Sequence, residues 1–452
     1  MIRLALVCLA SGHWFLAPAA AAPRPNIVFL MADDQGYADV GCYGSEHIRT
    51  PHIDKMAAEG MRFTDCYSGS AVCAPTRCVL MTGLHPGHCR RRDNTATGNL
   101  ESFGKERPLV FLEAGDVTVA EKLKEAGYAT GGFGKWGLGN PGSAGVPEKQ
   151  GFDLWFGYYD QVHAHTYYTD HLIRNSEKVP LDGKTYSHTP IMAEAFGFIE
   201  KHARAERPFF AYLAICPPHG KYVVPGQGIY TDEPWSEVDK NYAAMCTLID
   251  TNVGELFKLL ARLGIDENTI VFYTSDNGPN RQFLERFASN KPFRGIKRQL
   301  TEGGLRCPMV VRWPGTIGNG VTSGFAWTHK DFLATACELA GVDPPARTDS
   351  VSVLPVLTGR KQEALRNLYW EIHHPFQQAV RMGKWKGLRF GTKEPLQLYD
   401  LDADPSEAND LAAQHPGVVK RIEAIMAREH TPSPFYPAVE KARKKRRGKK
   451  AA

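Results

Sequence analysis

The chain has 452 residues, of which 43% are hydrophobic and 23% are charged, a composition typical of a globular enzyme long enough for two or three domains. The formal net charge of +5 comes from the C-terminus, because residues 441–450 contain eight basic residues and no acidic one. The rest of the chain is slightly acidic, which removes the argument for a nucleic-acid partner.

The first 22 residues have the pattern of a secretory signal peptide. Arg3 supplies a positive start, residues 4–16 form an apolar centre, and residues 20–22 are the small residues of a cleavage site. A membrane anchor is the alternative, but the apolar segment is short and is interrupted at residues 11–13. We therefore predict an exported protein, periplasmic or secreted, with no stable membrane insertion.

Apolar strands alternate with amphipathic helices along the next 320 or so residues. This order predicts right-handed βαβ crossovers and an α/β fold, in which a mostly parallel central sheet is flanked by helices on both faces. We expect strands at residues 26–32, 128–135, 208–215, 269–274 and 307–313, and helices at 50–61, 119–126, 191–203, 242–263 and 331–339.

Short alternating segments near the C-terminus predict a different unit. We expect a catalytic domain at residues 23–359, a smaller C-terminal α+β subdomain at 360–437, and a disordered basic tail at 438–452. The subdomain is predicted to contain a short antiparallel sheet, with strands at 369–372, 378–382, 385–389 and 396–399, followed by a helix at 417–428.

Polar residues directly follow three of the predicted strands. They are Asp33 and Asp34, His219 after two prolines, and Asp276 with Asn277. Ligands of parallel sheets bind beyond the carboxyl ends of the strands, so we expect these clusters to converge on one rim. The carboxylate and amide oxygens favour a hard cation, Ca²⁺ first and Mg²⁺ second, although Asp33 and Asp34 alone are also compatible with a solvated turn.

The stretch Cys73-Ala-Pro-Thr-Arg77 places a nucleophile-type residue at a predicted helix start. Pro75 suits a first helical turn, and Arg77 lies one turn from Cys73 on the same side. The free N–H groups of the helix start favour an anion beside Cys73. A buried cysteine and a surface arginine are the alternative. Lys135 stands among glycines at a strand end, where backbone can approach an anion.

His163 and His165 are two residues apart, which predicts that both imidazoles lie on one side of an extended segment. Core or surface histidines are the alternative interpretation. The mature chain also contains eight further cysteines, whose pairing the sequence leaves open: Cys42, Cys66, Cys78, Cys89, Cys216, Cys246, Cys307 and Cys337. No CxxC pair occurs, which does not favour a zinc site.

Cys73-x-Pro-x-Arg77 followed by Leu80, Thr82 and Gly83 resembles the signature of the type I, formylglycine-dependent sulfatases, an arylsulfatase-like family of the alkaline-phosphatase-type superfamily. The resemblance extends from about residue 26 to residue 437. Thr76 stands where serine is commoner. Gly134-Lys135-Trp136 is similar to the second signature of the family, but Gly137 follows where histidine is usual.

The resemblance implies hydrolysis of a sulfate monoester, on a carbohydrate or another small molecule, through a covalent sulfo-enzyme. It implies that a maturase converts Cys73 to formylglycine beside one Ca²⁺. The remaining roles are also implied by the resemblance: Asp33, Asp34, Asp276 and Asn277 as metal ligands with the residue at 73, Lys135, His219 and Lys297 around the sulfate, and Arg77 supporting the formylglycine. We hypothesise that His163 or His165 replaces the histidine missing at Gly137.

Two other functions stay open from the sequence. A phosphate- or phosphonate-ester hydrolase is the nearer alternative, since related enzymes share the fold and some use formylglycine. A binding protein for sulfated glycans that has lost turnover is the other, and the missing histidine at Gly137 is its motivation.

Overall fold

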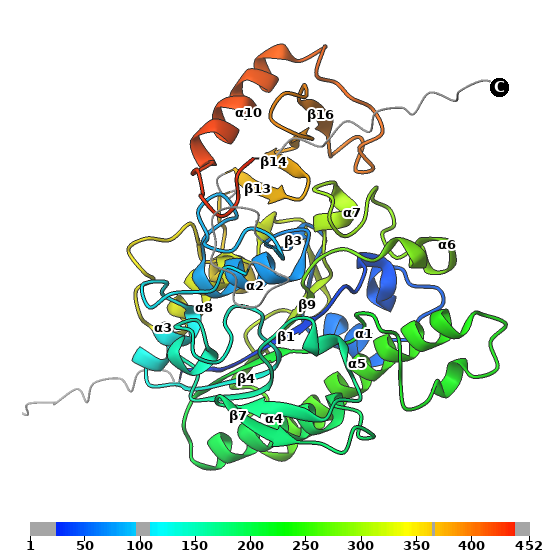
Figure 1. Cartoon of the computed structure of the whole chain (residues 1–452), viewed down its shortest axis with the longest axis vertical. Helices are drawn as coiled ribbons and strands as arrows, with labels where there is room; N and C mark the ends of the chain where they lie inside the picture. Colours follow the sequence, from blue (N-terminus) through cyan, green and yellow to red (C-terminus); the bar gives the residue numbers. More distant parts are fainter. Residues whose placement is uncertain (1–23, 96–108, 364–366, 439–452) are drawn as a thin grey trace, which may run out of the picture.

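The computed structural model describes residues 24–95, 109–363 and 367–438 (Figure 1). The predicted signal peptide and all but the first residue of the predicted basic tail therefore lie outside the described residues. None of the helices in the described ranges combines the length and the apolar character needed to cross a bilayer. The nine cysteines in these ranges are all free thiols.

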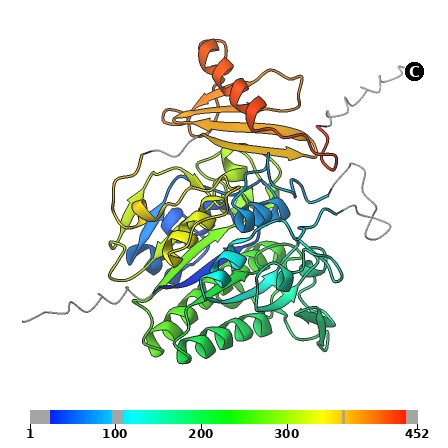
Figure 2. The same cartoon turned by 90° about the vertical axis from the view of Figure 1, so that its left-hand side faces the viewer.

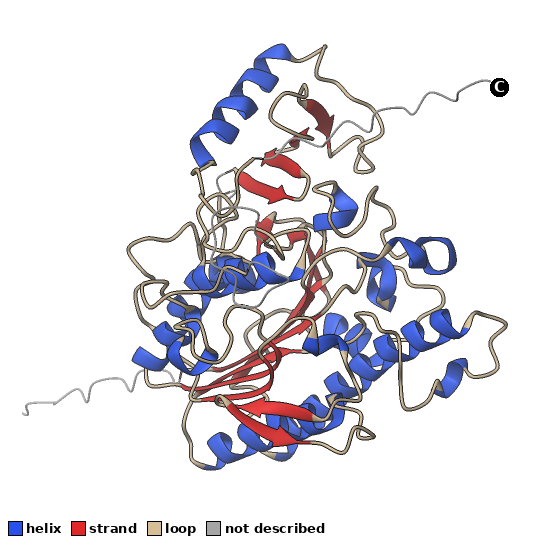
Figure 3. Ribbon diagram, in the orientation of Figure 1, coloured by secondary structure: helices blue, strands red, loops and turns tan. Residues whose placement is uncertain are grey.

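A large mixed sheet runs through the body of the molecule (Figure 3). Its core is parallel, as predicted, with β9, β1, β8 and β4 as direct neighbours. In spatial order the strands are β11 (Val321–Ser323), β2 (Met61–Phe63), β10 (Met309–Arg312), β9 (Thr269–Ser275), β1 (Asn26–Ala32), β8 (Phe209–Ala214), β4 (Ala129–Lys135), β5 (Leu154–Tyr158), β6 (His171–Arg174) and β7 (Glu177–Pro180).

Helices cover both faces of this sheet because successive side chains of each central strand point to opposite faces. In β1, Phe29 packs into one apolar layer and Leu30 into the other, and both are fully buried. The first layer contains α2 (Cys73–Thr82), α3 (Val119–Glu125) and α8 (Asp331–Ala340), and the second contains α1 (Pro51–Ala58), α4 (His188–Arg204) and α5 (Glu237–Arg262).

Two parts of the sheet differ from the expected parallel arrangement. Strand β10, expected from the apolar run at 307–313, pairs antiparallel with β9. The chain between these two strands contains only the 3₁₀ helix η6 (Arg281–Phe283) and the short helices α6 (Leu284–Phe287) and α7 (Glu302–Leu305), so no long helix carries it back across a face of the sheet. The hairpin of β6 and β7 adds an antiparallel edge to the sheet. The sequence had predicted no strand in this segment.

The carboxyl ends of the four central strands set the position of the site. Asp33 directly follows β1, Asp276 directly follows β9, and Lys135 is the last residue of β4. The chain after β8 leads through a short loop to His219. Because neighbouring parallel strands end at the same edge, these residues meet on one rim, as the sequence predicted.

The C-terminal unit is an antiparallel sheet covered by one helix, and it forms a separate layer at the top of the molecule in Figure 2. The prediction of this second, smaller α+β unit is confirmed. It consists of β13 (Leu368–His373), β14 (Phe376–Met382), β15 (Trp385–Arg389), β16 (Gln397–Asp400) and α10 (Pro416–Glu429).

Buried charges join this unit to the body of the molecule. Lys386 of β15 contacts Glu302 at the start of α7 (2.7 Å) and Glu407 (3.0 Å), and all three side chains are fully buried. Burial alone would raise the pKa of Glu302, but Lys386 and Arg306 together outweigh it and lower this pKa to about 2. A carboxylate with a depressed pKa stabilises the fold near neutral pH and loses that contribution as the pH falls towards about 2.

We expect Lys386→Met to lower the free energy of unfolding by about 3–5 kcal/mol, because it leaves the buried carboxylate of Glu407 without its cation and that of Glu302 with Arg306 alone. Denaturant unfolding followed by circular dichroism measures this change. The control is Lys384→Met, since Lys384 is 46% exposed where it pairs with Asp400 and should contribute little to stability. Equal losses in both variants would contradict a role for the buried network.

Candidate active site

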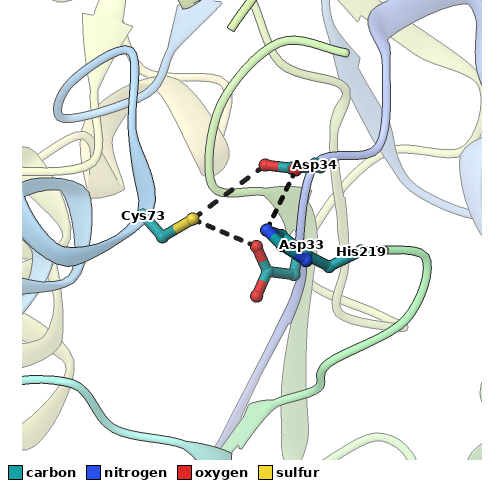
Figure 4. A group of neighbouring side chains, drawn as sticks. All are labelled: Asp33, Asp34, Cys73 and His219. Carbon is teal, nitrogen blue, oxygen red and sulfur yellow. Dashed lines mark hydrogen bonds and ion pairs between the residues drawn. The ribbon is translucent and has the colours of Figure 1, made fainter. Parts of the chain in front are cut away.

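Cys73 is the first residue of α2, and its sulfur points at Asp33 and Asp34 in a charged cluster (Figure 4). Its Sγ atom is 3.2 Å from Oδ1 of Asp33, 4.0 Å from Oδ1 of Asp34 and 3.5 Å from Nζ of Lys297. The cysteine is 1% exposed. The helix that carries it is capped by Gly83, whose φ of +65° suits glycine and ends the helix.

The thiol of Cys73 is not an activated nucleophile. Burial raises its pKa, and the neighbouring carboxylates Asp276 and Asp33 raise it further. Catalytic cysteines act as thiolates in surroundings that lower their pKa. The unmodified side chain is therefore protonated at neutral pH and poorly suited to attack an anionic ester.

Arg77 and Lys135 neutralise the carboxylates on one side of Cys73. Nη2 of Arg77 lies 3.1 Å from Asp276 and 3.5 Å from Asp33, and Nη1 donates to the carbonyl of Lys135. Nζ of Lys135 is 2.5 Å from Asp33. Burial alone would raise the pKa of Asp33. Four neighbours outweigh this effect and hold the pKa well below its usual value, so the carboxylate stays ionised; they are Lys135, His219, Arg77 and Lys297.

Asp34 contacts several of the remaining residues of the cluster. Its backbone is left-handed (φ +67°), and its N–H donates to Oδ1 of Asp276. Its carboxylate accepts from Lys297 (2.6 Å) and from the amide nitrogens of Asn277 (2.7 Å) and Asn280 (2.9 Å). Oδ1 of Asn277 is buried and has no hydrogen-bond partner among the described residues. A buried amide oxygen without a partner, on a residue that contacts Asp34 and adjoins Asp276, fits a cation site.

His219 completes the outer part of the cluster. Its Nδ1 donates to the carbonyl of Gly220, so Nε2 is the acceptor in the neutral ring and receives a hydrogen bond from Lys297 (3.2 Å). Nε2 also lies 3.3 Å from Asp34. Burial lowers the pKa of His219 despite the nearby carboxylate, which favours this neutral form.

The structure separates the two histidines that the sequence paired. His165 stacks on His219 with ring centroids 3.8 Å apart, and its Nε2 is 3.5 Å from Nζ of Lys135. His163 instead contacts Thr169 (2.8 Å) and lies outside the cluster. The expectation of an extended segment was wrong, because residues 163–165 form a 3₁₀ turn (η4, His163–His165), in which side chains two apart point in different directions.

The backbone conformation at position 137 explains why glycine stands there. Its φ is +82°, and a Cβ atom there would lie 2.4 Å from Nε2 of Gln161. A histidine at this position would therefore have a strained backbone and would require the side chain of Gln161 to move. The space beside Lys135 is occupied instead by the ring of His165, from another element of the chain.

Comparison with protein families agrees with this geometry. The family model described as Sulfatase matches residues 25–342, well over half of the chain. The chain belongs to the sulfatase family. A second model, described as N-sulphoglucosamine sulphohydrolase, C-terminal, matches residues 295–430, which include the antiparallel sheet and α10 of this sulfatase.

Several known proteins resemble this sulfatase over most of its length. An N-acetylgalactosamine-6-sulfatase of Canis lupus familiaris is 35% identical over 387 residues, covering 79% of this chain and 70% of that protein. An N-acetylgalactosamine-6-O-sulfatase of Bacteroides thetaiotaomicron is 29% identical, with 89% and 92% covered. The crystal structure of Ps i-CgsB in complex with k-i-k-neocarrahexaose has a TM-score of 0.81, 28% identity, and coverage of 91% and 95%.

The fold extends beyond sulfatases. The crystal structure of a phosphonate monoester hydrolase of Agrobacterium radiobacter has a TM-score of 0.65 at 19% identity and covers 90% of this chain, a likeness of fold alone. Family membership makes this sulfatase an enzyme. The roles of its individual residues stay predictions.

Two residues of the site were missed in the sequence. Asn280 contacts Asp34, and Asn94 accepts a hydrogen bond from the N–H of Ala74, the residue after Cys73. Asn280 follows Asp276 by four residues at the same strand end, so its position carried a signal. Asn94 lies in a loop with no motif, and only the folded chain places it at the start of α2.

Proposed function

We propose that this sulfatase hydrolyses a sulfate monoester on a carbohydrate, using a formylglycine that a maturase makes from Cys73 and a bound Ca²⁺. The observation that carries the proposal is the position of Cys73, buried among Arg77, Lys135 and Lys297 at the rim of the parallel strands. The carbohydrate is supported by the names of the relatives, which act on N-acetylgalactosamine 6-sulfate, and by the oligosaccharide complex of Ps i-CgsB.

The donor set fits a hard divalent cation. Asp33, Asp34, Asp276 and Asn277 supply oxygen atoms within one buried cluster, and the unpartnered Oδ1 of Asn277 is unexplained without a ligand. We propose these four, with the modified residue at 73, as the ligands of Ca²⁺, with Mg²⁺ as the second choice. When bound, the ion supplies positive charge that stabilises the charge building up on the transferring sulfuryl group.

Charge balance explains why such a site attracts a sulfate ester. The three carboxylates Asp33, Asp34 and Asp276 are matched by the three cations Arg77, Lys135 and Lys297. A divalent cation leaves the cluster with a net positive charge, which an anionic ester then reduces. In this buried, low-dielectric position the attraction is stronger than in water.

The chain's own residues have distinct tasks in the proposed reaction. Lys135 and Lys297 hold the sulfate oxygens and stabilise the added negative charge. Lys297 or His219, which lie 3.2 Å apart on the solvent side, protonates the leaving alcohol oxygen. Lys297 already carries the proton, whereas the neutral His219 would first have to receive it from Lys297 at Nε2. Hydrated formylglycine supplies two hydroxyls on one carbon, so the first forms the covalent sulfo-enzyme and the second allows sulfate to be expelled.

His165 is our candidate for the base that promotes this expulsion. Burial and the positive charge of Lys135 lower its pKa to about 2, so the ring is neutral before substrate binds. The negative charge of a bound sulfate ester would raise this pKa again and favour the protonated ring that forms when His165 acts as a base. We expect His165→Ala to reduce turnover about 100-fold or more and to accumulate a sulfated enzyme, seen by intact mass spectrometry. His163→Ala is the matched control. Unchanged turnover in His165→Ala would remove the assignment.

Peptide mass spectrometry of the segment containing Cys73 tests the proposed function most directly. After expression with a competent maturase, we expect an aldehyde at position 73 and faster turnover of an aryl sulfate than of the matching aryl phosphate. An intact thiol combined with phosphatase activity would favour the phosphoester alternative. Export after removal of residues 1–22 is part of the same proposal, and N-terminal sequencing of the secreted protein tests it.

A further inference from the structure

The exposed members of the cluster show from which side a substrate must enter. Lys297 and His219 keep 9% and 14% of their side-chain surface exposed, whereas Asp33, Arg77 and Lys135 keep none. An ester bound at Cys73 must therefore extend its alcohol part past Lys297 and His219. Exposed residues next to these two are therefore the ones to consider for contact with the sugar.

Arg298, the residue after Lys297, is fixed at this rim. Its N–H donates to the carbonyl of Ala71 (2.8 Å), two residues before Cys73. Its carbonyl accepts from Nε2 of Gln377 in β14 (3.0 Å), a side chain that is only 3% exposed. Oε1 of the same Gln377 accepts from the N–H of Leu300. The C-terminal sheet thus holds the loop that carries both Lys297 and Arg298.

The backbone of Arg298 is in a conformation that favours glycine. Its φ is +74°, in the left-handed region where a side chain on Cβ is strained. Such strain persists where the surrounding structure fixes it and is concentrated at ligand-binding positions. Glycine would fit this turn without strain. The local backbone conformation therefore gives no reason for an arginine at this position.

Arg298 is also a spare positive charge. The cations inside the cluster are each matched by a carboxylate, but Arg298 is exposed and no acidic side chain in the described part of the chain pairs with it. A guanidinium binds a carboxylate or a sulfate through two parallel hydrogen bonds, with more selectivity than a lysine. An anionic group of the substrate would supply the partner that this guanidinium lacks in the described part of the chain.

We propose that Arg298 binds a second anionic group of the glycan, beside the sulfate ester that is cleaved, and makes this sulfatase selective for multiply charged sugars. The inference rests on the proposed function, which supplies the position of the cleaved ester. Gln377 is a positioning residue in this arrangement, because it holds the backbone of Arg298 without reaching the substrate.

Kinetics of Arg298→Gly on a set of sulfate esters tests the proposal. We expect kcat/KM to fall about 10- to 100-fold for a disulfated monosaccharide, for a monosulfated disaccharide containing a uronate, or for both, which identifies the anion that is recognised. An aryl sulfate and a monosulfated neutral sugar should change less than about threefold. Arg298→Lys should retain part of the activity, and the distant exposed Arg421→Gln should match the wild type.

The melting temperature separates this role from a structural one. Since glycine suits a φ of +74°, Arg298→Gly should be at least as stable as the wild type while it loses the charged substrates. Equal losses on all esters, or no loss on any, would overturn the inference and leave the proposed function intact. Binding of the same sugars to Cys73→Ala, with and without Arg298→Gly, tests it independently of turnover.

Discussion

Cys73→Ser is expected to abolish steady-state turnover of sulfate esters, by a factor of about 10⁴ or more. The serine oxygen would stand among the same cations as the sulfur, 3.5 Å from Nζ of Lys297, so it can accept a sulfuryl group once. It lacks the second hydroxyl that expels sulfate. We therefore expect one equivalent of alcohol in a burst, and an enzyme heavier by one SO₃ group in intact mass spectrometry.

The control for this variant is Cys78→Ser, a fully buried thiol in the same helix. It should keep the turnover of the wild type, which separates the chemistry at position 73 from a disturbance of α2. Peptide mass spectrometry must show that the serine at 73 is intact and unoxidised. Multiple turnovers by an intact serine would exclude the need for formylglycine and so contradict the proposed mechanism.

The central fold was predictable because its signals are local and repeated. Continuous apolar runs such as residues 26–32 and 269–274 identify strands buried on both faces, and β1 and β9 match them closely. Element ends were less predictable. Helix α5 begins at Glu237, five residues before the expected start, because Ser236 caps it and its first turn is polar. The direction of β10 depends on a connection whose path the sequence does not specify.

The candidate site was predictable where residues adjoin strand ends, and not where a turn decides direction. Asp33, Asp276 and Lys135 meet because parallel strands end at one edge. His163 and His165 looked equivalent in sequence, and only the 3₁₀ turn shows that His165 alone reaches the cluster. Contacts across the two units, such as that between Gln377 and Arg298, have no local signature at all.

The cation itself provides the second large effect. We expect exhaustive chelation to reduce turnover of the sulfatase at least 100-fold and to lower its melting temperature, with Ca²⁺ restoring both better than Mg²⁺. An ion that binds the folded state alone stabilises it by about 2.7 kcal/mol at 100 times its dissociation constant. Without the ion, Asp276 is a buried carboxylate. Its burial and the charge of Asp33 raise its pKa to about 7, so Asp276 is partly protonated near neutral pH.

Asn277→Ala isolates the contribution of the unpartnered oxygen to that effect. Residues that only hydrogen-bond a metal ligand contribute roughly 10- to 100-fold to metal affinity. Removing a direct ligand oxygen should therefore weaken Ca²⁺ binding by at least this factor, and calorimetry on the chelated protein measures the change. The matched control is Asn268→Ala, because Asn268 precedes β9 at its opposite end and should leave affinity unchanged. Full activity and an unchanged melting temperature in protein free of residual metal would contradict the cation site. The unpartnered Oδ1 of Asn277 would then need another explanation, and Arg77 with the two lysines would have to supply all the positive charge that binds the ester.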